Sequence, residues 1–362
     1  MGRVHTPDLQ RERHRPIGLS IEDIDRPSMD SLCVVVPKKK AEPVRKRLME
    51  KGALRKGLQV RSDAKNVYLP VTQRVDLGYP FETMSFEELQ EQPKDYRLLV
   101  DVPNGLRSQL PSSYDVLGSV ALVKMDDEVL PHAEQIGRAI MAVQRAVTTV
   151  CVDEGVREEY RTRTLRVVAG DDTTETTHKE YGLVFKMDVR NVFFSPRLAT
   201  ERDIVAKQVQ PGEVVIDMFA GIGPFSIMIA KTRQPKVVYA IDTNPEAIRY
   251  MQENIALNKV STVMPILGDA RDEVAKLEPA DRVIMNLPHS AREFLPEAIS
   301  SLKPGGMMHF YEIMEDSELD SRFGMIADTA VRKGRVMKEL ARRKVKSYSP
   351  TMSFYAFDLS FI

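Results

Sequence analysis

The chain has 362 residues, enough for two or three domains, and its 52 basic and 52 acidic side chains leave no net charge. A hydrophobic content of 43% is ordinary for a globular protein, and no apolar run is long enough to cross a bilayer, so we expect no membrane association. Only two cysteines occur, which argues against a disulfide framework or a cysteine-ligated metal and predicts a reducing, cytoplasmic setting without a metal site.

The N-terminal third begins with a polar, Arg-rich stretch, residues 1–29, which lacks the apolar region of a secretory signal and predicts a flexible tail. The apolar segment SLCVVVP predicts a buried strand, residues 41–51 a basic helix and residues 58–71 a hairpin. We therefore expect a small α+β module at 30–75. Residues 76–95 have weak periodicity and predict a mobile linker.

Basic residues gather around the start of the predicted helix, among them Lys38, Lys39, Lys40 and Arg45. By itself such a cluster is more typical of a solvated face than of a phosphate site. Because the chain is neutral overall, any contact with nucleic acid must be local.

A second α+β domain is expected at 96–195. Its pattern predicts a strand at 116–125 and a long helix at 133–150. Three further strands are predicted at 165–169, 175–180 and 183–189.

Residues 196–362 change to a regular alternation of strand and helix, with VVIDMF, VVYAID, VMPILGD, RVIMN and MMHFYEI as successive strands. Such alternation predicts parallel strands with helical crossovers. The last two apolar segments, 344–349 and 352–361, are separated by two residues and should pair antiparallel at the sheet edge. The fold class predicted is α/β, with a Rossmann-like domain of the class I S-adenosylmethionine (SAM) methyltransferase type preceded by two smaller α+β domains.

The turn after the first of these strands predicts a ligand site. Gly221 and Gly223 let the backbone approach a ligand closely, but the third glycine of the dinucleotide fingerprint is missing. Asp217, Asp242 and Asp269 end three successive strands, where Asp242 can accept ribose hydroxyls and Asp269 an adenine amino group. Carboxylates in this series favour SAM over a dinucleotide.

Asn286-Leu287-Pro288 follows the fourth strand, at the edge where open α/β sheets bind ligands. A simple Asn-Pro turn is the alternative. Enzymes that methylate exocyclic amines usually have an aromatic residue here, which is absent, and neither cysteine lies where it could form the covalent adduct of pyrimidine C5 methylation. A ring nitrogen therefore remains as the acceptor.

At this point the chain resembles the archaeal and eukaryotic tRNA (guanine-37 N1)-methyltransferase family over nearly all of residues 30–362. The resemblance rests on FSPRLATER at 194–202, DMFAGIGPFS, AIDTNP and NLP. It implies SAM as cofactor and tRNA as partner, held at the anticodon loop by the catalytic part and at the outer corner by the N-terminal module, and we expect a monomer. The resemblance also turns Lys38, Lys39, Lys40 and Arg45 into expected phosphate contacts.

The same resemblance assigns individual residues. Guanine N1 must lose a proton before it is methylated, and the proposed base of the family matches Glu201, with Glu180 as a rival. Arg161 would face the guanine O6 and Asn286 would position guanine and SAM. Four residues match the SAM pocket of the family, namely Arg202, Phe219, Thr243 and Ala270. Arg197 matches a position that contacts tRNA.

Two other functions stay open at this stage. Wyosine-pathway relatives share much of the donor site and transfer the aminocarboxypropyl arm of SAM or methylate a tricyclic intermediate, although the aminocarboxypropyl enzymes lack Asn-Leu-Pro. A non-catalytic tRNA-binding protein that keeps SAM as a structural ligand is the alternative from another class.

Overall fold

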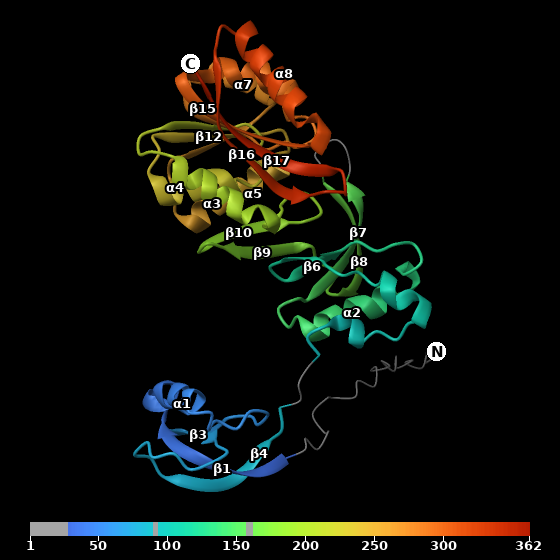
Figure 1. The fold of residues 1–362 in the computed structure, drawn as a ribbon, viewed down its shortest axis with the longest axis vertical. Helices are drawn as coiled ribbons and strands as arrows, with labels where there is room; N and C mark the ends of the chain where they lie inside the picture. Colours follow the sequence, from blue (N-terminus) through green and yellow to red (C-terminus); the bar gives the residue numbers. More distant parts are fainter. Residues whose placement is uncertain (1–27, 90–92, 157–161) are drawn as a thin grey trace, which may run out of the picture. The chain divides into compact units, whose positions relative to one another are not determined.

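The computed structural model describes residues 28–89, 93–156 and 162–362. It divides into two compact units, one within residues 1–92 and one at 93–362 (Figure 1). Within the described ranges, no helix is both long and apolar enough to cross a membrane.

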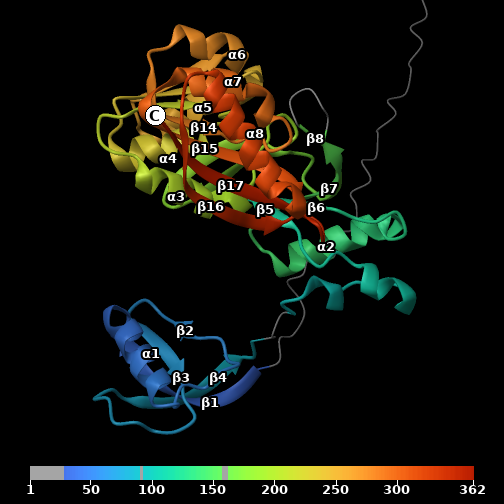
Figure 2. The same cartoon turned by 45° about the horizontal axis from the view of Figure 1, so that its top comes forward.

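The N-terminal unit is a four-stranded antiparallel sheet of order β2-β3-β1-β4 with one helix on it (Figure 2). Its elements are β1 (Ser28–Pro37), η2 (Lys38–Lys40), α1 (Ala41–Glu50), β2 (Arg61–Ser62), β3 (Asn66–Pro70) and β4 (Phe81–Glu87). Val44 and Leu48 of α1 pack on Val34, Val36 and Leu69 of the sheet, as their spacing of four residues predicts.

Two predictions about this unit were wrong. Strand β4 lies inside the expected linker 76–95 and pairs with β1, from Ser28↔Glu87 to Val34↔Phe81. Its hydrophobic alternation is weak because only Phe86 is fully buried, so the pattern did not reveal a strand. Strand β1 also begins at Ser28, inside the expected tail 1–29, whose first 27 residues lie outside the described part.

The second unit begins with a mixed sheet of order β5-β6-β7-β8, crossed by one helix. Its elements are η3 (Tyr96–Leu98), η4 (Asn104–Gln109), β5 (Asp115–Leu117), β6 (Val120–Val123), η5 (Leu130–His132), α2 (Ala133–Val143), β7 (Thr149–Val156) and β8 (Arg163–Gly170). The predicted strand at 116–125 is a hairpin, because Gly118 adopts a φ of +56° and turns the chain. The helix expected at 133–150 ends at Val143, and the β-branched run that follows forms β7 instead.

The hairpin of β9 (Glu175–Glu180) and β10 (Leu183–Asp188) packs on the last part of the chain, against our boundary at 195/196. Asn254 accepts a hydrogen bond from the Lys186 backbone N–H at 2.7 Å, and Asn258 accepts one from that of Val184 at 2.9 Å. These bonds and a shared apolar core join residues 93–362 into one unit.

The large sheet of the second unit has seven strands in the order β13-β12-β11-β14-β15-β17-β16, parallel except at β17, which runs antiparallel to both neighbours. Its strands are β11 (Val214–Asp217), β12 (Val237–Asp242), β13 (Val263–Leu267), β14 (Ala280–Met285), β15 (Leu302–Glu315), β16 (Met337–Ser347) and β17 (Met352–Phe361). The five predicted parallel strands and the terminal antiparallel hairpin are confirmed, although β16 begins seven residues before position 344.

Helices cover both faces of this sheet (Figure 1). One face carries η6 (Pro196–Leu198), α3 (Ala199–Gln208), α4 (Pro224–Arg233) and α5 (Pro245–Asn258). The other carries α6 (Ala270–Glu273), η7 (Val274–Lys276), η8 (Ala291–Phe294), α7 (Leu295–Ser301), η9 (Asp316–Glu318) and α8 (Leu319–Arg332). The carboxyl ends of β11, β12, β13 and β14 therefore meet at one edge, where the predicted site residues lie.

Candidate active site

The glycine turn after β11 has the backbone that its two glycines predict. Gly221 has a φ of +56° and Gly223 a φ of +83°, both in the left-handed region that favours glycine. A Cβ atom at Gly223 would lie 2.8 Å from Cγ of Met251, too close for any side chain. The turn thus brings bare backbone to the end of the sheet.

Asp217 ends β11 as a fully buried carboxyl. Its Oδ2 accepts a hydrogen bond from the Ser226 hydroxyl at 2.8 Å, while Oδ1 is buried without a partner among the described residues. Burial raises the pKa of Asp217 to about 7. A buried oxygen without a hydrogen-bond partner at the glycine turn indicates that a bound ligand supplies the hydrogen bond.

Asp242 and Asp269 end the two neighbouring strands. Asp242 holds the glycine turn, because its Oδ2 accepts the Gly221 backbone N–H at 2.7 Å and its Oδ1 that of Asn244 at 2.9 Å. Burial raises the pKa of Asp242. Asp269 caps α6 by accepting the Arg271 backbone N–H at 2.8 Å. Each carboxylate oxygen keeps a lone pair for a ligand hydroxyl or amine.

The remaining predicted donor residues surround this edge. Phe219 packs edge-on against Phe294 with ring centroids 4.9 Å apart, Thr243 is exposed, and Ala270 is buried at the start of α6. The guanidinium of Arg202 is buried and makes a bidentate ion pair with Glu180 of β9, where Nε lies 2.7 Å from Oε1.

The Asn286-Leu287-Pro288 motif, which is predicted to hold the base to be methylated, follows β14. The backbone oxygen of Pro288 accepts a hydrogen bond from Ile313 of β15 at 2.9 Å, which fixes the loop to the sheet. The side-chain Oδ1 of Asn286 is buried and has no partner in the described part of the chain. It is a second acceptor without a donor at the same sheet edge.

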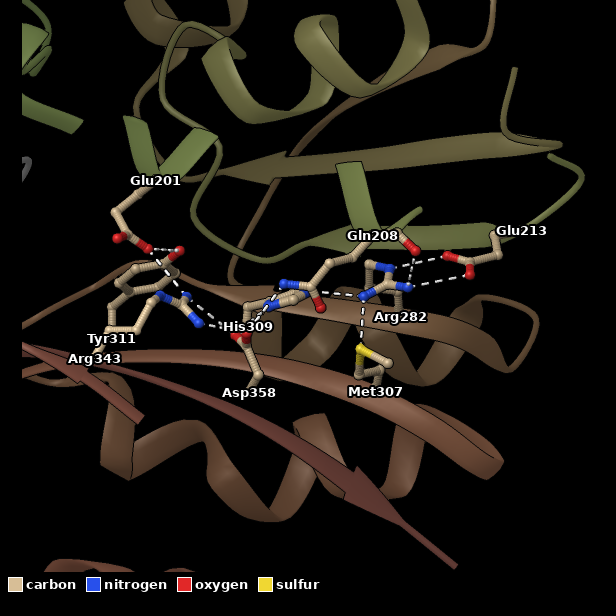
Figure 3. Close-up of polar contacts among 9 residues, drawn as sticks. All are labelled: Glu201, Gln208, Glu213, Arg282, Met307, His309, Tyr311, Arg343 and Asp358. Carbon is tan, nitrogen blue, oxygen red and sulfur yellow. Dashed lines mark hydrogen bonds and ion pairs between the residues drawn. The ribbon is translucent and has the colours of Figure 1, made fainter. Parts of the chain in front are cut away.

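Glu201, the predicted base, lies in the first turn of α3 and is 5% exposed. Its Oε2 accepts hydrogen bonds from the Tyr311 hydroxyl and from Nη2 of Arg343, both at 3.1 Å (Figure 3). Within the described ranges no hydrogen bond reaches Oε1. Tyr311 also packs against Phe225, the second residue of α4 after the glycine turn, with ring centroids 6.0 Å apart.

Sequence analysis missed the partners of Glu201. Tyr311 and Arg343 lie on β15 and β16, and Asp358 of β17 pairs with Arg343. The basic run ARRKVK gave no local signal that separates Arg343 from its neighbours. Arg161, the other predicted catalytic residue, lies outside the described residues.

The predicted tRNA contacts lie in both units. Lys38, Lys39 and Lys40 are exposed on η2, and Arg45 is 3.5 Å from Glu42. Arg197, in η6 of the second unit, donates from Nε to Asp115 at 2.7 Å while its side chain stays 49% exposed.

A cavity of about 380 Å³ opens between β8 and the start of α5. Arg163, Arg190 and Asn244 are among the residues that line it. Asn244 caps α5 directly after Asp242, so the cavity adjoins the donor edge.

The strand order with an antiparallel β17, the glycine turn and the carboxylates at successive strand ends define a class I SAM-dependent methyltransferase. The unpartnered oxygens of Asp217 and Asn286 and the bare backbone at Gly223 fit that cofactor. Residues 176–337 match the TRM5/TYW2 methyltransferase domain, residues 96–173 the TYW2 N-terminal domain and residues 33–77 the tRNA methyltransferase 5 N-terminal domain.

The chain belongs to the TRM5/TYW2 methyltransferase family. It is 43% identical over 330 residues to the tRNA (guanine(37)-N(1))-methyltransferase Trm5b of Pyrococcus abyssi, covering 91% of this chain and 98% of the relative. The crystal structure of that Trm5b superposes with a TM-score of 0.70 over 91% of this chain and 99% of the other. The complex of aTrm5 with tRNALeu is 33% identical, with a TM-score of 0.67 over 91% of this chain and 99% of the other.

A relative with another activity covers less of the chain. The tRNA(Phe) (4-demethylwyosine(37)-C(7)) aminocarboxypropyltransferase of Methanocaldococcus jannaschii is 36% identical over 252 residues, 68% of this chain and 97% of its own length.

Proposed function

We propose that this protein transfers the methyl group of SAM to N1 of guanosine 37 in tRNA. One observation carries the proposal. The similarity to Trm5b extends over 91% of this chain, whereas the aminocarboxypropyltransferase is matched almost completely by 68% of it. The N-terminal unit therefore accompanies the methyltransferase relative, and the tRNA methyltransferase 5 N-terminal domain matches it.

The reaction needs three things from the chain: a site for SAM, a site for guanine and a base that takes the N1 proton. SAM supplies a methyl group on a sulfonium, which leaves as a neutral thioether. Guanine N1 bonds to the methyl carbon as the carbon–sulfur bond breaks, and the N1 proton goes to a carboxylate of the protein. We assign that proton to Oε1 of Glu201.

Glu201 is favoured over Glu180 because of the way each carboxylate is occupied. Both oxygens of Glu180 are taken by the guanidinium of Arg202, so a second proton donor would compete with a buried ion pair. Among the residues that the structure describes, Tyr311 and Arg343 hold Oε2 of Glu201 and none holds Oε1. The free oxygen supports Glu201 as the base.

Asn286 fits the guanine edge. The Watson–Crick edge of guanine presents two donors, N1–H and the exocyclic amine, and the buried Oδ1 of Asn286 is an acceptor without a partner in the described structure. The base must leave the anticodon-loop stack to reach it. We keep Arg161 as the proposed donor to O6, where negative charge grows as N1 loses its proton.

The N-terminal unit supports a contact to the outer corner of tRNA, because η2 presents three exposed lysines in succession. We further propose that the protein acts as a cytoplasmic monomer. Two buried free cysteines in a chain without a disulfide support a reducing compartment.

Two radiolabels test the activity. Unmodified tRNA transcript and, separately, tRNA that carries 4-demethylwyosine at position 37 are each incubated with SAM labelled in the methyl group or in the carboxyl group, and the label is mapped by nuclease digestion. We expect methyl label at N1 of guanosine 37, no carboxyl label, and no product from a transcript with adenosine at position 37. Carboxyl label in the tRNA would identify an aminocarboxypropyltransferase, and no label from either SAM would identify a non-catalytic binding protein.

A further inference from the structure

A continuous row of polar side chains lies under α3 on one face of the sheet (Figure 3). This polar row consists of Arg282, His309, Tyr311, Asp358 and Arg343, which come from β14, β15, β17 and β16. Glu201 and Gln208 reach it from α3, where their spacing of seven residues places them on the same side of the helix, two turns apart.

Strand register builds the row. His309 lies directly opposite Asp358, and both Tyr311 and Arg343 lie opposite Ala356. Ala356 therefore lies between Tyr311 and Arg343 on this face, and Glu201 approaches these two side chains from α3. Its Oε2 then stands 3.1 Å from both donors.

His309 is neutral in this row. Arg282 can only donate, so the Nε2 of His309, 2.7 Å from Arg282, must accept, and the ring proton lies on Nδ1, 2.7 Å from Asp358. Burial lowers the pKa of His309, in agreement with this assignment. Burial opposes ionisation of Asp358, but the His309 and Arg343 hydrogen bonds hold the pKa of Asp358 below its usual range.

The charges of the row and its partners are almost balanced. The guanidinium groups of Arg282 and Arg343 face three carboxylates, those of Glu201, Asp358 and Glu213. One negative charge is therefore in excess while Glu201 is ionised, and the cluster becomes neutral when Glu201 takes up a proton. On the same helix, Arg202 pairs with Glu180 and Asp203 with Lys207, so neither neighbour changes this balance.

We propose that Arg343 and Tyr311 are positioning residues for methyl transfer, which fix Oε2 of Glu201 so that Oε1 faces the guanine N1 proton. This inference rests on Glu201 being the base of the proposed reaction. Arg343 stays paired with Asp358 when Glu201 takes up the proton, so the transfer leaves no unpaired buried charge. The terminal hairpin thus completes the base that α3 carries.

The test is a pH profile of the single-turnover rate constant for Arg343→Gln, Arg343→Lys and Tyr311→Phe, with the dissociation constant for SAM measured alongside. The matched control is Arg342→Gln, on the same strand but paired with Glu339. Losing the charge-assisted hydrogen bond to Oε2 of Glu201 should lower the plateau rate constant about tenfold, and removing the cation beside that carboxylate should move the acid limb to higher pH.

We expect Arg343→Lys to keep the acid limb in place because the cation remains, and Tyr311→Phe to slow the reaction without altering SAM affinity. An Arg343→Gln profile that coincides with that of Arg342→Gln would overturn the inference. Tyr311→Phe leaves the Arg343–Asp358 ion pair intact, so its rate constant still tests the inference if Arg343→Gln does not fold. Should Glu201→Gln itself remain active, the assignment of the base fails, whatever Arg343 does.

Discussion

The parallel and antiparallel halves of the large sheet do different work by different means. In the parallel half, β11, β12 and β13 place the glycine turn beside carboxylates, and the bond from Gly221 to Asp242 joins residues only 21 apart in the chain. In the antiparallel half, β15, β17 and β16 hold Glu201 through a contact to Arg343 that spans 142 residues. The proposed donor site is thus a local product of strand–turn–helix units, whereas the surroundings of Glu201, the proposed base, form only when strands far apart in the chain pair.

This comparison predicts that the two functions separate. A change in the parallel half should alter SAM affinity and leave the pH dependence of the chemical step alone. A change in the antiparallel half should do the reverse.

Glu201→Gln should slow single-turnover methyl transfer by about 100-fold to 10,000-fold, because a general base contributes about that much. The dissociation constant for SAM should change little. Asp203→Asn is the matched control, since Asp203 lies on the same helix and pairs only with Lys207 in the described structure. Equal rates for the two variants would show that Glu201 is not the base and that the antiparallel half does not act through it.

Asp217→Asn should change how stability depends on pH. The pKa of Asp217 is raised by burial to about 7 from 3.8, so the folded protein binds an extra proton between those values. The stabilisation is present in full below pH 4 and is lost as pH rises toward 7, a change of at most about 4 kcal/mol in the free energy of unfolding.

Denaturant unfolding at a series of pH values measures this contribution. The parent chain and Asp217→Asn should have similar free energies of unfolding at acid pH. Near neutral pH the free energy of unfolding of the variant should be the larger. Asp269→Asn, at an exposed helix cap, serves as the control and should give no such slope. A parallel pair of pH curves for the parent and Asp217→Asn would contradict the prediction.

Gly223→Ala should weaken SAM binding about 30-fold, because the free variant relaxes the strained turn and SAM binding must restore it at a cost of about 2 kcal/mol. The new Cβ would also meet Cγ of Met251 at 2.8 Å. Gly212 has the same positive φ, +82°, but open space around it, so Gly212→Ala isolates the backbone cost. Isothermal titration measures the affinity of both variants for SAM. Equal affinities would contradict the role of the glycine turn in SAM binding.

Arg197→Gln should give the smallest effect. The exposed ion pair with Asp115 is worth less than about 1 kcal/mol, so stability should hardly change. If Arg197 contacts a phosphate, the slope of log affinity for tRNA against log salt should fall by about one. Arg97→Gln, with a similar exposed pair to Asp95, is the control, and an identical salt slope for both would remove Arg197 from the tRNA surface.

Prediction from sequence succeeded where the signal was local and periodic. The alternation from Val214 onward gave the five parallel strands, and the two-residue gap before Met352 required the antiparallel hairpin. It failed where a segment has a weak pattern and gains its structure from a partner. Strand β4 is held by pairing with β1, and β7 was taken for a helix end because Thr149 and Val150 follow the helical run without a break signal.

The sequence alone therefore determined the fold class, the SAM cofactor and the family, since these depend on short motifs whose residues act within one strand–turn–helix unit. The way each candidate base is occupied, by contrast, depends on the folded protein. Arg202 holds Glu180 on both oxygens, while Tyr311 and Arg343 hold one oxygen of Glu201. Those partners come from strands far along the chain, and their approach depends on strand register, which leaves no periodic trace in the sequence.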